Sequence, residues 1–122
     1  MATARYLVTD VARAVAFYRD LLEFGVEDEM LPAFARVRLG DLDLWLAGPT
    51  SSAARPMPDG RQPVPGGWSR IVIEVDDLDA FVARLRNVGA TFRNDVVSGP
   101  GGKQILLDDP DGNVVELFEA RA

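Results

Sequence analysis

Residues 7–24 read LVTDVARAVAFYRDLLEF and combine the end of a short strand with an amphipathic helix. The run from Arg5 to Val8 is typical of a strand, and Thr9 and Asp10 are residue types that cap helix N-termini. Apolar side chains then recur at helical spacing, namely at Val11, Ala14, Val15, Tyr18 and Leu22. This part of the chain therefore predicts a strand followed by a helix with one buried face.

Three strand candidates follow the helix, at about residues 25–29, 33–39 and 42–47. Gly40-Asp41 joins the last two as a hairpin turn. Along the third candidate the side chains alternate between two faces, with Leu42, Leu44 and Leu46 on one and Asp43, Trp45 and Ala47 on the other. The first 47 residues thus predict the order strand, helix, strand, strand, strand.

Residues 48–67 interrupt this pattern. They contain five of the eight prolines, several glycines and serines, and no periodicity, which is typical of a linker or lid. The segment is longer than most connections inside compact domains, so we expect it either to cover a site or to be mobile.

The same order of elements returns after residue 68. Ser69 to Val75 predicts a strand, Asp76-Asp77 predicts a helix cap, and the helical spacing recurs at Leu78, Phe81, Val82, Leu85 and Val88. Strand candidates follow at 91–93, 103–107 and 113–118, and the turn-forming residues 108–112 separate the last two.

These two copies predict one domain over residues 1–122, with repeat 1 at about 1–47, a linker or lid at 48–67 and repeat 2 at about 68–122. At an offset of 67 residues, Val8-Thr9-Asp10-Val11 aligns with Val75-Asp76-Asp77-Leu78. A generic α+β domain with accidental periodicity is the alternative.

Charge and composition restrict the function classes. With 19 acidic and 13 basic residues the net charge is -6, which argues against a nucleic-acid partner because a phosphate backbone would be repelled. The chain has no apolar run long enough to span a bilayer and no signal-peptide pattern at its start, so we expect no membrane partner and a cytoplasmic location.

The sequence contains no histidine and no cysteine. Their absence excludes disulfides, thiolate nucleophiles, Ser-His-Asp and Cys-His catalysis, and zinc sites built on nitrogen or sulfur. Any metal ion would have to be held by oxygen ligands alone.

Residues 7–24 closely resemble the opening of vicinal oxygen chelate domains, the family that includes glyoxalase I, bleomycin-resistance proteins and extradiol dioxygenases. Residues 109–117, DPDGNVVEL, resemble the signature in the last hairpin of that family, and residues 73–78, IEVDDL, also match. The resemblance implies an α+β fold in which two tandem βαβββ modules form a concave, partly closed mixed sheet, as in glyoxalase and bleomycin-resistance proteins. It does not specify an activity, because this fold hosts many chemistries.

The resemblance also implies where a metal ion would be bound in metal-dependent members. Thr3 and Arg70 occupy the two histidine positions, and Glu116 matches the closing glutamate ligand. The first-half partner of that glutamate is Asp43 or Trp45, depending on the register. Because a guanidinium group stays cationic and has no lone pair to offer, we expect no metal site and no cofactor.

Strand alternation, together with this resemblance, predicts a small-molecule cavity lined by both halves. Thr3, Arg5 and Leu7 share one face of the first strand, as do Arg70, Val72 and Glu74 in the second half and Val114, Glu116 and Phe118 in the last strand. The predicted ligand-binding residues are Arg5, Asp43, Trp45, Arg70, Glu74, Glu116 and Phe118. No catalytic residue is assigned.

Structural roles compete with these assignments. In the fold that the resemblance implies, Arg70 and Glu116 would lie on neighbouring strands and could form an ion pair that only fills the place of a metal. Trp45 could serve the core or a dimer interface. The acidic run Asp108, Asp109 and Asp111 favours a hairpin turn over a calcium loop, since it lacks the glycine and closing glutamate of such a loop.

The leading functional hypothesis is a metal-independent small-molecule-binding protein of the bleomycin-resistance type, which sequesters a cationic or aromatic drug or metabolite. The alternative is a vicinal-oxygen-chelate enzyme of the lyase, isomerase or dioxygenase type. Glu116 or Glu74 would be its base and Arg70 would stabilise an oxyanion, either metal-free or with a divalent metal held by Glu116 and Asp43. The resemblance also implies a homodimer as the assembly.

Overall fold

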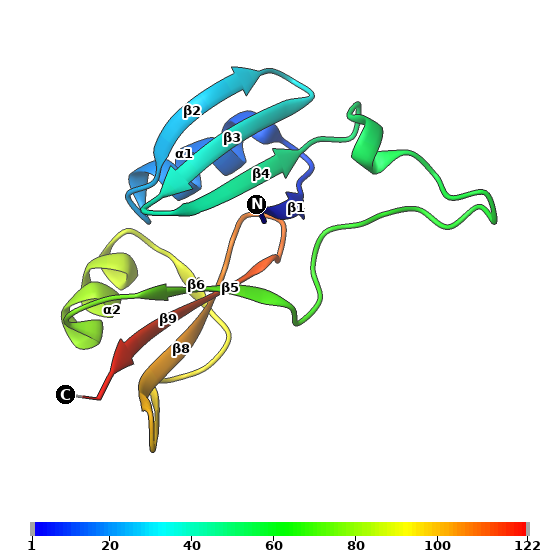
Figure 1. The fold of residues 1–122 in the computed structure, drawn as a ribbon. Coiled ribbons are helices and arrows are strands. Elements are labelled where there is room, and N and C mark those ends of the chain that lie inside the picture. Colours follow the sequence, from blue (N-terminus) through cyan, green and yellow to red (C-terminus); the bar gives the residue numbers. More distant parts are fainter. Residues whose placement is uncertain (1, 122) are drawn as a thin grey trace. The chain divides into compact units, whose positions relative to one another are not determined.

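The computed structural model describes residues 2–121. Along the chain it falls into two compact units, with the boundary between Gly66 and Gly67. We call these unit 1 and unit 2. Each contains a mixed β-sheet and an α-helix (Figure 1). The boundary lies close to the predicted start of repeat 2 at about residue 68.

Unit 1 has the order strand, helix, strand, strand, strand. Its elements are β1 (Ala4–Leu7), α1 (Val11–Asp20), β2 (Gly25–Met30), β3 (Phe34–Leu39) and β4 (Leu42–Ala47). The strands form a sheet of order β1-β4-β3-β2, in which β1 runs parallel to β4 and the other neighbours are antiparallel. The sheet therefore places the first and last strands of the repeat side by side.

Asp10 starts α1, because its carboxylate accepts a hydrogen bond from the backbone N–H of Arg13 at 3.1 Å. Of the two cap candidates, Asp10 is thus the N-cap residue. The apolar stripe of the helix is buried, and the opposing sheet residues Ala35, Val37, Leu44 and Leu46 are fully buried as well. The core of unit 1 consequently lies between α1 and one face of the sheet.

Unit 2 repeats this plan with one addition. Its elements are β5 (Arg70–Glu74), α2 (Leu78–Asn87), β6 (Thr91–Phe92), β7 (Val97–Gly99), β8 (Gly102–Asp108) and β9 (Val114–Ala120). The sheet order is β5-β9-β8-β6, with β5 parallel to β9, and β7 pairs with β8. The short strand β7 is not among the predicted elements, because three residues without alternation give no strand signal.

Two acidic residues fix the start of α2. Asp77 is the N-cap and accepts from the backbone N–H of Ala80 at 3.1 Å, while the Glu119 carboxylate on β9 accepts from the backbone N–H of Leu78 at 2.8 Å. Lys103 lies 3.2 Å from Asp79, and this hydrogen bond raises the pKa of the lysine. These charged groups are therefore engaged in anchoring the helix to the sheet.

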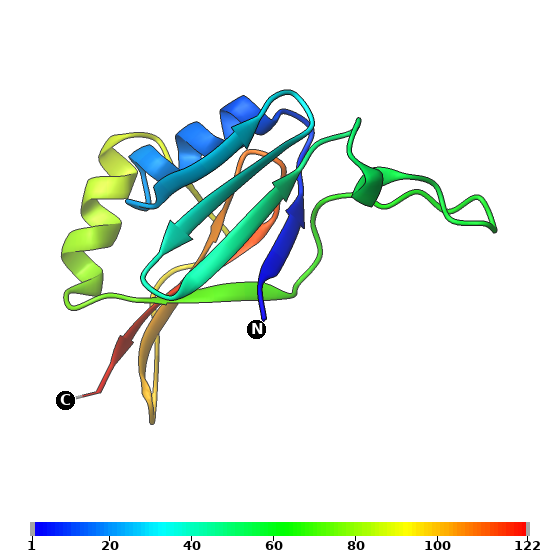
Figure 2. The same cartoon turned by 45° about the horizontal axis from the view of Figure 1, so that its top comes forward.

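The α+β fold of two tandem βαβββ modules is confirmed, since both units place strands and a helix in the predicted order. The proline-rich segment 48–67 contains one 3-10 helix, Ser52–Ala54, and otherwise runs as an extended loop (Figure 2). The turn after β8 is closed by Asp109, whose Oδ1 accepts from the backbone N–H groups of Asp111 and Asn113, both at 2.9 Å. This acidic run therefore forms a hairpin turn.

Gly102→Ala is expected to lower the free energy of unfolding by about 2 kcal/mol. Gly102 has φ of 149°, and a Cβ there would meet the backbone oxygen of Glu119 on the neighbouring strand β9. Gly99→Ala is the matched control, because a Cβ at Gly99 has no atom within 4 Å, and we expect its effect to stay within about 0.5 kcal/mol. Urea denaturation of both variants measures the difference, and equal losses would contradict the steric argument.

Candidate functional site

Three of the predicted site residues lie on one face of the unit 1 sheet. Arg5 on β1 is the register partner of Trp45 on β4, and Asp43 precedes Trp45 by two residues on the same strand. The Arg5 guanidinium carbon lies 5.0 Å from the centre of the Trp45 ring, a cation–π distance. This face is the one turned away from the buried leucines of β4.

Asp43 is a buried carboxylate on β4 held between two arginines of the neighbouring strand β3. Only 6% of the residue is exposed, and its oxygens lie 3.6 Å from Nη2 of Arg36 and 3.5 Å from Nη1 of Arg38. The antiparallel register of β3 and β4 produces this arrangement, because it sets Arg38 opposite Asp43 and Arg36 opposite Trp45. The carboxylate is therefore neutralised by guanidinium groups inside its own unit.

Trp45 is half-buried and belongs to an aromatic pair. Its ring meets Phe34 edge to face at a centroid distance of 5.8 Å. The indole Nε1 of Trp45 and the Nε of Arg36 are both buried and have no hydrogen-bond acceptor within the described residues 2–121. The face thus holds more N–H donors than acceptors.

Sequence reasoning missed Phe34, Arg36 and Arg38 as members of this face. The signal was present in the strand candidate 33–39, where these three side chains alternate with Ala35 and Val37. The arginines could have been assigned by applying the same period of two that separated the faces of β4. Their pairing with Asp43 required the register between the strands.

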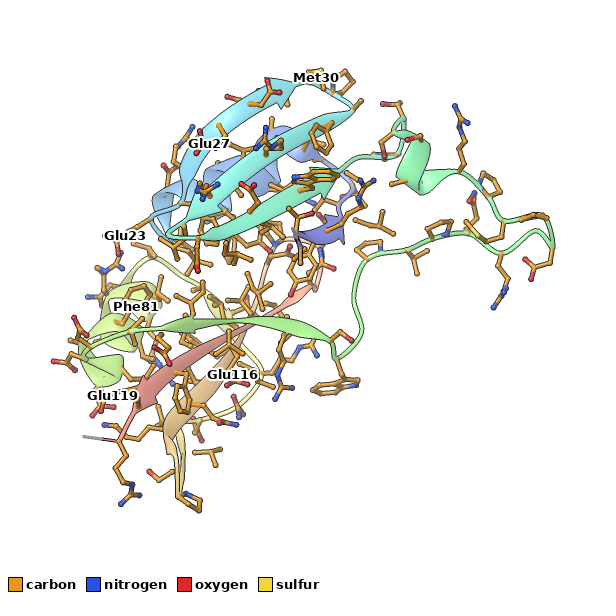
Figure 3. All side chains as sticks on the ribbon, viewed as in Figure 1. Glu23, Glu27, Met30, Phe81, Glu116 and Glu119 are labelled. Atoms are coloured by element: carbon orange, nitrogen blue, oxygen red, sulfur yellow. The ribbon has the colours of Figure 1, made fainter. Side chains whose placement is uncertain are left out.

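The remaining four predicted residues lie on one face of the unit 2 sheet. Arg70 and Glu74 point to the same face of β5, and their register partners on β9 are Val114 and Phe118. Glu116 lies between those partners on β9 and, by strand alternation, shares their face. Figure 3 labels Glu116. The seven residues therefore fall into two groups, one on the sheet of each unit.

Arg70 and Glu116 form an ion pair, with Nε of Arg70 donating to Oε1 of Glu116 at 3.1 Å. Glu116 is 8% exposed, and its register neighbours Val72 and Leu106 are apolar. A carboxylate in such surroundings needs a charged partner, which Arg70 supplies. Whether the pair is only structural or also contacts a ligand stays a prediction.

Glu74 and Phe118 occupy the other end of this face. Glu74 is exposed and Phe118 is half-buried beside Gln104, its register partner on β8. One end of this face therefore carries Arg70, paired with Glu116. The other end carries the exposed carboxylate of Glu74, with the Phe118 ring as its register partner. These groups can hydrogen-bond and stack against a small molecule.

The donor set does not fit the metal site that the resemblance implies. Glu116 is bonded to Arg70, which stands at a histidine position, and Asp43 is bracketed by Arg36 and Arg38. A divalent cation would have to displace guanidinium groups that cannot lose their charge. No group of three carboxylates suited to a metal ion occurs among residues 2–121.

The fold and the two residue groups define a small α+β protein built from βαβββ modules, with polar side chains on its sheet faces. The chain belongs to the Glyoxalase/Bleomycin resistance protein/Dioxygenase superfamily, whose sequence profile matches residues 1–117. Among residues 2–121, neither α-helix is long and apolar enough to cross a bilayer.

Individual relatives agree with this assignment. The uncharacterized protein YaeR of Escherichia coli is 31% identical over 116 residues, covering 93% of this chain and 90% of YaeR. The crystal structure of lactoylglutathione lyase from Agrobacterium tumefaciens has a TM-score of 0.79 at 21% identity, covering 98% of this chain and 92% of the lyase. TnmS3, an antibiotic-binding protein from Streptomyces sp. CB03234, has a TM-score of 0.71 at 24% identity, covering 99% and 97%. The two structural likenesses show the fold.

Proposed function

We propose that this protein binds a small molecule without a metal ion and sequesters it, as a drug- or metabolite-binding member of its superfamily. The observation that carries this proposal is the Arg70–Glu116 pair. Glu116 corresponds to a metal ligand in the resemblance, and here it is buried and bonded to an arginine at 3.1 Å. A guanidinium group at a histidine position can hydrogen-bond and attract charge, but it cannot coordinate a metal ion.

The side chains on the two sheet faces support recognition of this kind. Arg70 uses Nε for Glu116, so its remaining N–H groups point to a role in holding a ligand oxygen. Trp45 and Phe118 offer ring faces or edges for stacking. That an antibiotic-binding protein has the same fold is consistent with small-molecule binding by this chain. Homodimer formation and a cytoplasmic location belong to this proposal and rest on the family.

The enzyme alternative assigns Glu116 or Glu74 as a general base. Glu116 is less suited to this task, because one of its oxygens already accepts a hydrogen bond from a permanent cation. Glu74 is exposed, and within residues 2–121 no hydrogen bond or ion pair positions its carboxylate. The geometry therefore favours binding over catalysis.

Calorimetric titration of chelator-treated protein with aromatic antibiotics and aromatic metabolites tests the proposal. We expect at least one compound to bind once per chain, with the same affinity in the presence and absence of EDTA, and to be recovered chemically unchanged by mass spectrometry. Arg70→Gln is expected to weaken that binding about tenfold, because a charge-assisted hydrogen bond is lost. Arg61→Gln is the control, since Arg61 is an exposed arginine whose side chain pairs with Asp59. Binding that requires an added divalent metal, or conversion of the compound, would refute the proposal.

A further inference from the structure

One face of the unit 1 sheet collects cations and aromatic rings. We call it the arginine–tryptophan face and define it by Arg5, Phe34, Arg36, Arg38, Asp43 and Trp45. The strand registers place these side chains together, since Trp45 is the partner of both Arg5 and Arg36, and Asp43 is the partner of Arg38. Phe34 precedes Arg36 by two residues and contacts the Trp45 ring.

The charge of this face is opposite in sign to that of the chain. The chain carries a net charge of -6, whereas the face holds three arginines. They are opposed by the buried Asp43 and by the exposed Asp28, the register partner of Arg36 on β2. Arg36 and Arg38 share Asp43, and among residues 2–121 Arg5 has no carboxylate partner, only the Trp45 ring. Among these five side chains, the arginines exceed the carboxylates by one positive charge.

The same face has hydrogen-bond donors that lack acceptors. The Nε of Arg36 and the Nε1 of Trp45 are buried without a partner in the described part of the chain. Buried polar groups in folded proteins are almost always paired, so these two donors mark a place where hydrogen bonding within the described residues is incomplete. Both atoms are covered, but the guanidinium ends remain reachable, since the Arg36 and Arg38 side chains are 38% and 42% exposed and Arg5 is exposed.

We propose that the arginine–tryptophan face binds the anionic oxygen group of a small aromatic molecule. The oxygen atoms would be held by the guanidinium groups of Arg5 and Arg36, and the ring would pack beside Trp45 and Phe34. Guanidinium groups match the geometry of carboxylates and phosphates, and aromatic rings favour edge or offset contacts with a third ring. This inference rests on the proposed binding function and names a ligand class, an aromatic carboxylate or phosphate, for the unit 1 face alone.

A set of naphthalene compounds separates the ring from the charge. The anionic probes are 2-naphthoate and 2-naphthyl phosphate, and the matched neutral and cationic probes are 2-naphthylmethanol and 2-naphthylmethylamine. By calorimetry we expect one of the anions to bind about tenfold more tightly than the neutral probe, and the amine to bind more weakly still. The stronger of the two anions identifies carboxylate or phosphate as the preferred group.

Variants locate the binding on this face. Arg5→Gln and Arg36→Gln are each expected to weaken binding of the preferred anion about tenfold and to leave the neutral probe within about twofold. Arg5→Gln keeps the test valid if Arg36→Gln disturbs Asp43, because Arg5 lies over the Trp45 ring and pairs with no carboxylate of residues 2–121. Arg19→Gln is the control, since Arg19 is an exposed arginine of α1 bonded to Asp20. In nitrogen-15 NMR spectra, the indole N–H signal of Trp45 is identified by its absence in Trp45→Phe. In the parent protein this signal should shift when the anion is added.

Three results would overturn this inference. They are equal affinity for the neutral probe and both anions, losses in Arg5→Gln and Arg36→Gln no larger than in Arg19→Gln, and no binding of either anion at millimolar concentration. If any of these results were obtained but a neutral or cationic compound bound without a metal ion, this inference would be wrong and the proposed function would still hold. A requirement for metal would instead refute the proposed function while the preference for anions could still be measured.

Discussion

Arg70→Ala is expected to lower the free energy of unfolding by about 3 kcal/mol, because it leaves the buried Glu116 carboxylate without its cation. The value lies at the lower end of the range for broken buried ion pairs, since the Arg70 side chain is 31% exposed. Val72 and Leu106 flank Glu116 and offer no replacement donor from their side chains. Urea denaturation followed by circular dichroism measures the loss.

The double variant Arg70→Met with Glu116→Leu is the informative companion. It removes both charges and keeps similar volumes, so we expect its stability to lie within about 1 kcal/mol of the parent protein. Together with the single variants Arg70→Met and Glu116→Leu it completes a double-mutant cycle, which isolates the energy of the pair from the cost of an abandoned charge. If Arg70→Ala were as stable as the parent, water or another donor would be solvating the Glu116 carboxylate. Burial of Glu116 would then not make Arg70 necessary for stability.

Arg93→Ala should destabilise unit 2 by about 3 kcal/mol, because one guanidinium group makes three hydrogen bonds at once. Its Nε donates to Asp108 at 2.6 Å, Nη1 to the carbonyl of Gly67 at 3.0 Å and Nη2 to the carbonyl of Gly112 at 2.9 Å. The guanidinium also lies 4.6 Å from the centre of the Trp68 ring. Arg93 thereby ties the first residues of unit 2 to β8 and to the turn that follows it.

Two variants sharpen this prediction. Arg61→Ala removes an ion pair of similar length, 2.8 Å to Asp59, but with side-chain exposures of 82% and 55%, so its effect should stay within about 0.5 kcal/mol. Arg93→Lys keeps the charge and loses the planar fork, so it should recover less than half of the stability lost in Arg93→Ala. Thermal and urea unfolding of the three variants compare them directly. Equal stability of Arg93→Lys and the parent would show that charge alone is sufficient at this position.

Local periodicity was enough to predict most of the helices and strands, and the family resemblance supplied their arrangement in the fold. Within residues 2–121, the two α-helices and eight of the nine strands follow from spacing and turn residues that lie within a few positions of one another. The helix caps at Asp10 and Asp77 were within reach for the same reason, since a cap bonds to a residue three positions away. Only the short strand β7 lacked such a local signal.

The partners of the charged side chains were decided by tertiary structure. The Arg70–Glu116 pair, 46 residues apart, was anticipated only through the family resemblance, and no local pattern indicated that Arg93 reaches Gly67 across 26 residues. The sequence identified Asp43 as a candidate, but only the register of β3 against β4 shows that two arginines enclose it. A shift of one residue in that register would turn every side chain of a strand to the opposite face, and composition and spacing along one strand do not specify it.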